Sequence, residues 1–304
     1  MQGTTSSPSS ITLSRDEEQW IGRFTAMACP CEVLIERAPE AVARRIVEAA
    51  AACAWRIELK FSRYRSDGVV HTINSSAGRA VVLDEESAAL IDFAETLTRM
   101  SEGRFDITSG VLRAVWTFDG GSVVPSQEEI DAVMTCVGWQ HVQWRKPVLQ
   151  LRPGMQIDLG GIGKEYAVDL AAAQIEQIAP GSSCLINFGG DVAVRNPRQD
   201  GQPWRVGIEA AGQAGKAVRL VHLTRGGLAT SGDSRRFVLH RGRRYSHIID
   251  ARTGWPVTDA PHSITVAADT CTQAGTLTTL AMLRGNECEE FLRASGAKYW
   301  IQPL

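Results

Sequence analysis

The sequence of 304 residues lacks several features that would place it in a protein class directly. No uninterrupted apolar stretch reaches the roughly 18 residues that a membrane-spanning helix needs, so we expect no membrane span. Charge of one sign is not in excess either, because 32 basic and 34 acidic residues give a formal net charge of -2. This balance excludes a general attraction to nucleic acid or to an anionic membrane. Any binding of phosphate groups must therefore be local.

Paired cysteines are scarce as well. The seven cysteines are an odd number, and only Cys29 and Cys31 lie close together, which favours a reducing compartment. In an extended segment these two thiols would share a face, but they supply only two of the four ligands of a structural zinc site.

Residues 1–20 are polar and show neither the basic nor the apolar region of a secretory signal. We therefore expect a flexible tail over residues 1–20 and a cytoplasmic protein.

The remaining sequence, residues 21–304, has the composition of one large folded domain. With 44% hydrophobic and 22% charged residues, it can bury a full core. No solenoid repeat or low-complexity linker divides it. Apolar spacing and capping residues predict these elements: a strand over 28–36, helices over 40–59 and 84–100, an irregular segment over 61–74, a short helix from Ser126, a helix over 164–178, a strand over 184–188, short strands over 204–267, helices over 272–284 and 287–294, and a last strand near Tyr299.

Strands and helices follow one another in separate runs. This order favours an α+β fold with mixed or antiparallel sheets over a doubly wound parallel sheet. Because no linker separates the two kinds of run, we expect packed helices and sheets in two interleaved halves of a single body.

The segment MQIDLGGIGKEYAVD, residues 155–169, is the most informative part of the chain. Its glycines let the backbone approach a ligand and expose N–H groups to an anion. Lys164 stands in the first turn of the following helix, where a cation opposes the helix dipole. A phosphate contact would reverse that penalty, so we expect Lys164 to bind phosphate. An ordinary strand-to-helix connection would also account for the glycines.

This segment is not a nucleotide loop of either common kind. A Walker A loop has glycine where this chain has Asp158, and serine or threonine where it has Glu165. The dinucleotide fingerprint needs a third glycine where Tyr166 stands. Both alternatives are excluded.

Further glycine turns with polar residues follow along the chain. They are NFGGD at 187–191, ATSGD at 229–233 and SHIIDARTGWPV at 246–257. Earlier, FDITSGVL at 105–112 leads into a segment in which Trp116 and Phe118 flank Thr117, typical of a binding loop. One such turn is commonly only a turn, but several in one chain favour a ligand site.

Taken in order, these blocks resemble the ApbE family of FAD:protein FMN transferases. The resemblance begins at Met27 of MACPC, continues through FSRYRSDGVVHTIN at 61–74 and the blocks above, and reaches Val257. It implies an ApbE-like flavin transferase fold. It also implies that the protein binds FAD and, with Mg²⁺, moves FMN onto a threonine of a target flavoprotein, releasing AMP.

The resemblance also implies a set of flavin-binding residues. Aromatic and thioether side chains suit the flavin and adenine rings, and an acid suits a ribose hydroxyl or the adenine amine. Some of the apolar members could instead belong to the core. The residues are Met27, Tyr64, Trp116, Thr117, Phe118, Asp158, Lys164, His247 and Ile248.

His247 and Asp250 are the candidate catalytic residues. The resemblance places His247 at the flavin site, where an imidazole of near-neutral pKa could take a proton from the incoming threonine. The alternative is a core histidine paired with a carbonyl. Asp250 could fix the histidine tautomer or only cap the following turn.

The metal site departs from the family pattern. The resemblance implies an aspartate and, one helical turn later, a threonine that bind Mg²⁺ together with a carbonyl of the DLGG turn. Here the aspartate position is Gly275, and the remaining candidates, Thr279 and the Gly161 carbonyl, carry no charge, although Mg²⁺ favours at least one carboxylate. Asp233 or Asp250 could approach from elsewhere.

A second departure is Glu165, which stands where the family commonly has glycine. A carboxylate in the first turn suits the helix dipole, so we interpret it as structural. The sequence leaves three functions open: FMN transfer, FAD binding without transfer because of Gly275, and metal-dependent cleavage of FAD by water.

Overall fold

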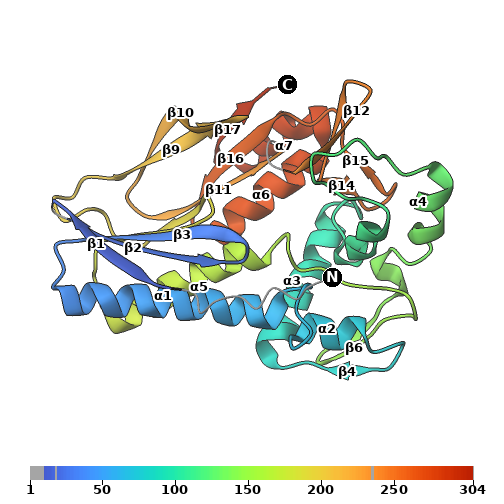
Figure 1. Ribbon diagram of the computed structural model, residues 1–304, viewed down its shortest axis with the longest axis horizontal. Helices are drawn as coiled ribbons and strands as arrows, with labels where there is room; N and C mark the ends of the chain where they lie inside the picture. Colours follow the sequence, from blue (N-terminus) through green and yellow to red (C-terminus); the bar gives the residue numbers. More distant parts are fainter. Residues whose placement is uncertain (1–9, 18, 234–235, 304) are drawn as a thin grey trace.

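A computed structural model describes residues 10–17, 19–233 and 236–303. Its main feature is an eight-stranded sheet in which every neighbouring pair is antiparallel (Figure 1). This arrangement confirms the expected α+β class. In sheet order the strands are β1 (Thr12–Asp16), β2 (Gln19–Ala26), β3 (Cys29–Glu36), β7 (Cys184–Phe188), β8 (Asp191–Val194), β11 (Gly226–Gly232), β16 (Ser263–Ala268) and β17 (Lys298–Gln302).

The sheet is covered on both faces. Helices α1 (Glu40–Phe61), α5 (Gly163–Ile178) and α6 (Cys271–Leu283) pack on one face, and the hairpin of β9 (Trp204–Ala210) and β10 (Gln213–Leu223) closes the other. In β7, Ile186 points to the helices and Leu185 to the hairpin, because side chains alternate along a strand. Burial on both sides explains why residues 184–188 are almost continuously apolar.

Local capping signals place several helix boundaries where the sequence predicts them. The Asp84 carboxylate accepts the Ser87 amide at the start of α3, and Ser126 and Glu129 form a reciprocal capping box at the start of α4. The remaining helical elements are α2 (Val69–Asn74), α3 (Glu85–Met100), η1 (Ile107–Ala114), α4 (Gln127–Met134), η2 (Trp139–His141), η3 (Gly285–Glu287) and α7 (Cys288–Ser295).

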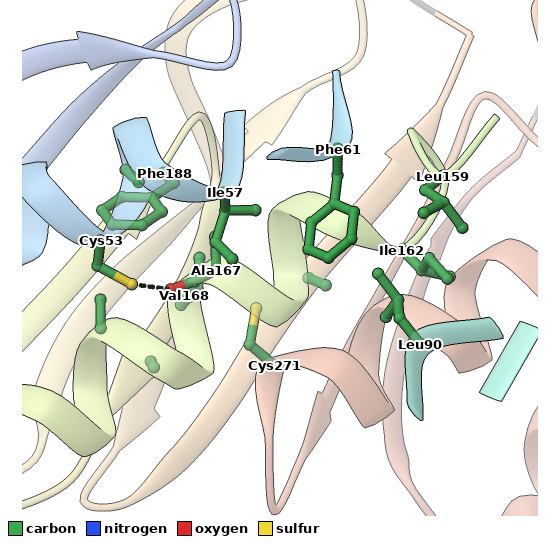
Figure 2. Packing of buried hydrophobic residues seen from close by; sticks show 14 of the residues in the cluster. Cys53, Ile57, Phe61, Leu90, Leu159, Ile162, Ala167, Val168, Phe188 and Cys271 are labelled. Atoms are coloured by element: carbon green, nitrogen blue, oxygen red, sulfur yellow. Dashed lines mark hydrogen bonds between the residues drawn. The ribbon is translucent and has the colours of Figure 1, made fainter. Parts of the chain in front are cut away.

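Helices α5 and α6 are joined by a cap that spans about a hundred residues of sequence. The Asp169 carboxylate on α5 accepts the amides of Cys271 at 2.8 Å and Thr272 at 2.7 Å, the first residues of α6. Figure 2 shows the apolar packing around this junction, with Cys53 of α1 beside Ala167 and with Cys271 of α6 nearby. The start of α6 is thereby fixed against the first two turns of α5.

Two expectations about the chain are wrong. Residues 12–16 form the edge strand β1, paired with β2, so the flexible tail does not extend to residue 20; residues 1–9 lie outside the described ranges. The segment 61–74 is not irregular throughout, because Val69–Asn74 forms α2.

Within the described residues no helix is long and apolar enough to cross a membrane. The short strands are β4 (Val81–Val82), β5 (Gln143–Arg145), β6 (Val148–Gln150), β12 (Phe237–His240), β13 (Arg243–Ser246), β14 (Ile249–Asp250) and β15 (Trp255–Pro256).

Candidate functional site

The glycine turn that precedes α5 is held by two neighbouring segments. Asn74, the last residue of α2, accepts the Ile157 amide at 2.7 Å and donates to its carbonyl at 3.0 Å. The Asp158 amide donates to the Ile107 carbonyl at 2.8 Å. These bonds satisfy the backbone of an irregular segment and fix the direction in which α5 begins.

Asp158 has partners within the protein. Its carboxylate accepts the Gly160 amide at 2.9 Å and forms a short ion pair with Arg63. Arg63 also donates to the Tyr64 hydroxyl at 2.8 Å, and its guanidinium lies 4.9 Å from the Tyr64 ring centroid. Sequence reasoning missed Arg63, although it lies in the block 61–74 that carries the resemblance.

Tyr64 is highly accessible, with 73% of its surface exposed. Burial of its hydroxyl raises its pKa, but hydrogen bonds and charges from Arg63 and Arg236 outweigh that effect and lower it. An exposed aromatic ring held by two arginines is a surface that could stack on a planar ligand.

Lys164 lies at the start of α5 as predicted, but its partner is a residue of the protein. Its ammonium is 2.5 Å from Oδ2 of Asp191, whose side chain is only 2% exposed. Burial lowers the pKa of Lys164, whereas the carboxylates of Asp191 and Glu165 raise it by more, so the ammonium stays charged. Sequence reasoning did not select Asp191, although this residue ends the NFGGD motif that it had noted.

Glu165 is half-buried and its carboxylate faces the protein, contrary to its interpretation as a first-turn residue that only complements the helix dipole. Burial raises its pKa to about 8, and the negative charge of Asp191 adds to the shift, although Lys164 opposes it. Its Oε2 is inaccessible and has no hydrogen-bond partner in the structure.

Met27 and Ala28 form the two-residue turn between β2 and β3. Both have positive φ, at 52° and 57°, a conformation that residues other than glycine and asparagine rarely adopt. Met27 is partly buried against the main core. Such backbone strain is concentrated at functional sites, so the conformation is compatible with the predicted flavin contact.

The aromatic loop divides into a buried and an exposed part. Trp116 is 3% exposed, donates to the Gly254 carbonyl at 2.9 Å and packs against Trp255, so its ring belongs to a core cluster. Phe118 stacks on it with centroids 5.5 Å apart, and Thr117 between them is exposed. Trp116 therefore belongs to the core, whereas Thr117 and Phe118 are still accessible to a ligand.

His247 lies beside the aromatic loop. Its ring is 6.5 Å from that of Phe118 in an edge-to-face arrangement, and Nδ1 is 3.3 Å from the Arg236 carbonyl. Although the residue is exposed at the surface, surrounding protein desolvates the imidazole and lowers its pKa, and the charge of Arg236 lowers it further. The imidazole is therefore neutral at pH 7. The next residue, Ile248, is held by the bond from the Val257 amide to its carbonyl at 2.9 Å.

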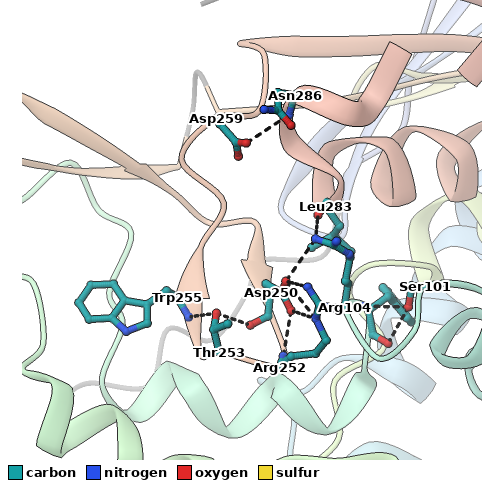
Figure 3. Close-up of polar contacts among 10 residues, drawn as sticks. Ser101, Arg104, Asp250, Arg252, Thr253, Trp255, Asp259, Leu283 and Asn286 are labelled. Carbon is teal, nitrogen blue, oxygen red and sulfur yellow. Dashed lines mark hydrogen bonds and ion pairs between the residues drawn. The ribbon is translucent and has the colours of Figure 1, made fainter. Parts of the chain in front are cut away.

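Asp250 does not orient His247. Figure 3 shows its carboxylate bound by Arg252, with Nη2 at 2.7 Å, and facing Arg104 at 3.6 Å. It also accepts the Arg252 amide at 3.0 Å, while its carbonyl accepts the Gly254 amide. The catalytic assignment of Asp250 is therefore corrected: the residue caps the turn, and the histidine is held by a backbone carbonyl.

The candidate metal donors come from two elements of the fold. Gly275 is buried in α6, and Thr279 is half-buried one turn later. Gly161 is exposed in the turn before α5. Asp233 accepts from His262 and Arg244 and so has other partners.

No group of three His, Cys, Asp or Glu residues in the described part of the chain has the arrangement of a metal site. This finding also removes the possibility that other residues of these types complete a zinc site with Cys29 and Cys31. A hydrogen bond between the two thiols lowers the pKa of Cys29 and raises that of Cys31. A cation would therefore find at most two of these residues and would need carbonyl, hydroxyl or substrate oxygens besides.

Comparison with known proteins identifies what the chain is similar to. The model of the ApbE family matches residues 27–300. An FAD:protein FMN transferase of Escherichia coli is 33% identical over 79% of this chain and 71% of its own length. One of Vibrio cholerae is 30% identical over 75% and 70%, respectively.

Solved structures agree with the sequence relatives. The crystal structure of an ApbE protein of Thermotoga maritima superimposes with a TM-score of 0.85 at 30% identity, covering 93% of this chain and 94% of that one. The flavinyl transferase ApbE of Pseudomonas stutzeri, in its apo form, gives 0.80 at 27% identity, covering 96% and 91%. The fold expected from the sequence is thereby confirmed.

Proposed function

Because this chain belongs to the ApbE family, we propose that it is an FAD:protein FMN transferase. It transfers the FMN half of FAD to the hydroxyl of a threonine in a target flavoprotein and releases AMP. The observation that carries this function is the match of almost the whole chain to the family, together with relatives of that activity over more than two thirds of their length.

The reaction breaks the phosphoanhydride bond of FAD and forms a phosphoester bond to the threonine. The threonine oxygen attacks the phosphorus of the FMN half, and the bond from that phosphorus to the bridging oxygen breaks. The hydroxyl proton goes to a base, and AMP leaves with the bridging oxygen. Catalysis of such a transfer requires positioning of the phosphates and neutralisation of their charge.

His247 is the base in this proposal. Its lowered pKa keeps the imidazole neutral at pH 7, so it can accept the threonine proton. The Arg236 carbonyl beside Nδ1 favours a proton on that nitrogen and leaves Nε2 as the acceptor. His247 also stands next to Phe118, which together with Tyr64 and Met27 we assign to the flavin and adenine rings.

Lys164 provides positive charge for the phosphates. Its pKa is raised, and Asp191 holds the ammonium in place without closing it off, since the lysine side chain remains 30% exposed. A phosphate oxygen can therefore share the ammonium with Asp191. Asp158, fixed by Arg63, is assigned to a ribose hydroxyl or the adenine amine.

Oxygen atoms at the start of α5 and on α6 suit Mg²⁺. The donors available are the Gly161 carbonyl and the Thr279 hydroxyl, and the buried oxygens Glu165 Oε2 and Thr276 Oγ1 have no hydrogen-bond partner. Hard oxygen ligands of this kind are those that Mg²⁺ prefers. When bound, the cation would neutralise charge that develops on the two phosphates.

The test uses the purified full chain, FAD, Mg²⁺ and a target domain that carries an acceptor threonine. We expect a mass increase of the target by one FMN and the appearance of an equal amount of AMP. FMN and AMP without modified target would identify water as the acceptor, and intact FAD would identify a binding protein. Either result would refute the transferase.

We also propose that the protein acts in the cytoplasm. All seven cysteines are unpaired in the structure, as a reducing compartment favours. Cell fractionation followed by immunoblotting tests this; recovery in any other fraction would refute it.

A further inference from the structure

The space beside Gly275 is filled by the side chain of Glu165. A Cβ atom built on Gly275 would lie 2.5 Å from Cγ of Glu165, 2.8 Å from Oε1 and 2.9 Å from Cδ. Atoms of two side chains do not approach so closely. The carboxylate of Glu165 therefore occupies the volume in which a side chain at position 275 would begin.

One oxygen of this carboxylate has no donor among the described residues. Oε2 is buried and without a hydrogen-bond partner. The nearby ammonium of Lys164 is 2.5 Å from Asp191, and the next acid on the helix, Asp169, caps α6. An unpartnered buried carboxylate oxygen is costly, so a native site that retains one has a reason to keep it.

Other oxygen atoms without hydrogen-bond partners come from the elements that pack against Glu165. Among the described residues, Thr276 Oγ1 on α6 is buried and unpartnered. Oδ2 of Asp191, on β8, forms an ion pair with the lysine ammonium and makes no aligned hydrogen bond within the described residues. Helix α5, which carries Glu165, packs on both α6 and β8.

The charges of this cluster are also unbalanced. When both are ionised, Glu165 and Asp191 contribute two negative charges against the single ammonium of Lys164. The pyrophosphate of FAD would bring further negative charge to the same helix start. A divalent cation would satisfy the oxygens and balance the charge, whereas a side chain or water could not do both.

We infer that Glu165, on α5, supplies the carboxylate ligand of the cation site in place of a residue at position 275 on α6. The two departures from the family pattern, Glu165 and Gly275, are thus one exchange of a ligand between facing positions. Glycine at 275 is required because any larger residue there would displace the Glu165 side chain. The inference rests on the proposed function, since it assigns the cation of the same site.

The test measures binding of Mn²⁺ alone, as a spectroscopic substitute for Mg²⁺, from the loss of the free-ion EPR signal in the full chain. We expect one bound ion in the wild type and a rise in Kd of at least about tenfold in Glu165→Gln, because loss of even an outer-shell partner weakens metal affinity by this much. Glu176→Gln is the matched control. It lies on the same helix, but Glu176 contacts Gly181 and Asn196.

The exchange itself is tested by moving the acid back. The Kd of Mn²⁺ for the double variant Glu165→Gly/Gly275→Asp should be within about threefold of the wild-type value. The Kd for Glu165→Gly alone should be higher than the wild-type value by at least about tenfold. Wild-type affinity in Glu165→Gln, or no bound ion in the wild type, would overturn the inference. Because the measurement needs neither FAD nor a target protein, its outcome is independent of whether the chain transfers FMN.

Discussion

The contact between Glu165 and position 275 predicts an unusual reversal in protein stability. We consider Gly275→Ala, the smallest change that adds a Cβ atom. In the wild-type background this atom would meet Cγ of Glu165 at 2.5 Å, and Cγ can move only by rotation about χ1, which swings the whole buried carboxylate. Adding a methyl group to a packed site commonly costs about 1–3 kcal/mol.

The same substitution also has a favourable effect. Position 275 lies inside α6, where alanine is preferred over glycine by about 1 kcal/mol. In the wild type the two contributions oppose one another, and we expect a net loss of up to about 2 kcal/mol in the free energy of unfolding. In the background of Glu165→Ala the steric conflict is gone, so Gly275→Ala should stabilise the protein by about 1 kcal/mol.

The assay is urea denaturation, monitored by circular dichroism, of the wild type, Gly275→Ala, Glu165→Ala and the double variant. The coupling energy between the two sites should be about 1–3 kcal/mol, well above the few tenths expected for independent sites. Equal effects of Gly275→Ala in both backgrounds would refute the close packing of Glu165 on Gly275. Metal-free buffer with EDTA keeps this test separate from cation binding.

Three further predictions concern His247 and Asp250. His247→Asn should reduce the rate of FMN transfer by about 10²–10⁴ while FAD binding, measured by flavin fluorescence, is retained; an unchanged rate would exclude the histidine as base. Because the pKa of His247 is lowered, the wild-type rate should be constant from pH 8 to below the ordinary histidine pKa of 6.5 and should fall only as the imidazole protonates at lower pH. The residual activity of His247→Asn should lack this fall. If both proteins show the same fall, the group that titrates is not His247. Asp250→Asn should lower stability in urea by about 1–3 kcal/mol, because Arg252 loses its carboxylate partner, but should leave the pH profile of the rate unchanged, since Asp250 does not contact His247.

Features that depend on short stretches of sequence were predictable. The cap at Asp84 and the capping box of Ser126 and Glu129 each lie within four residues, and the helices that they begin were predicted at these positions. The helix over 40–59 appears as Glu40–Phe61 because its apolar periodicity is long and regular. The short helix α2 was missed because its six residues, VVHTIN, are rich in β-branched residues, which have low helix propensity.

Features that depend on contacts between distant residues were not predictable. Whether Trp116 binds a ligand or fills the core depends on Gly254 and Trp255, which are far away in sequence. Spacing alone likewise allowed Asp250 to orient His247, and only the structure shows that Arg252 takes its carboxylate. The family resemblance supplied the site's location, but the partners within the site come from tertiary structure.

The relation between Glu165 and Gly275 shows why each departure was misleading when considered alone. Glu165 was compatible with a helix-dipole role, and Gly275 was compatible with a lost metal site, because nothing in the sequence indicates that they face one another across 110 residues. Steric overlap makes their effects interdependent. Gly275→Asp alone would bury two acids in overlapping space, so it should be the least stable variant and should not improve cation binding.

Glu165→Gly alone removes that conflict but also the carboxylate. It should fold with a loss of about 1 kcal/mol or more, from glycine in the helix and the emptied space, and should bind the cation weakly. A route from one arrangement to the other that preserves the fold therefore passes through the variant with glycine at both positions rather than through the one with two acids. Urea midpoints and Mn²⁺ affinities of the two single variants test this order: a Gly275→Asp protein as stable as Glu165→Gly would show that the two side chains can coexist and that the positions are not alternatives.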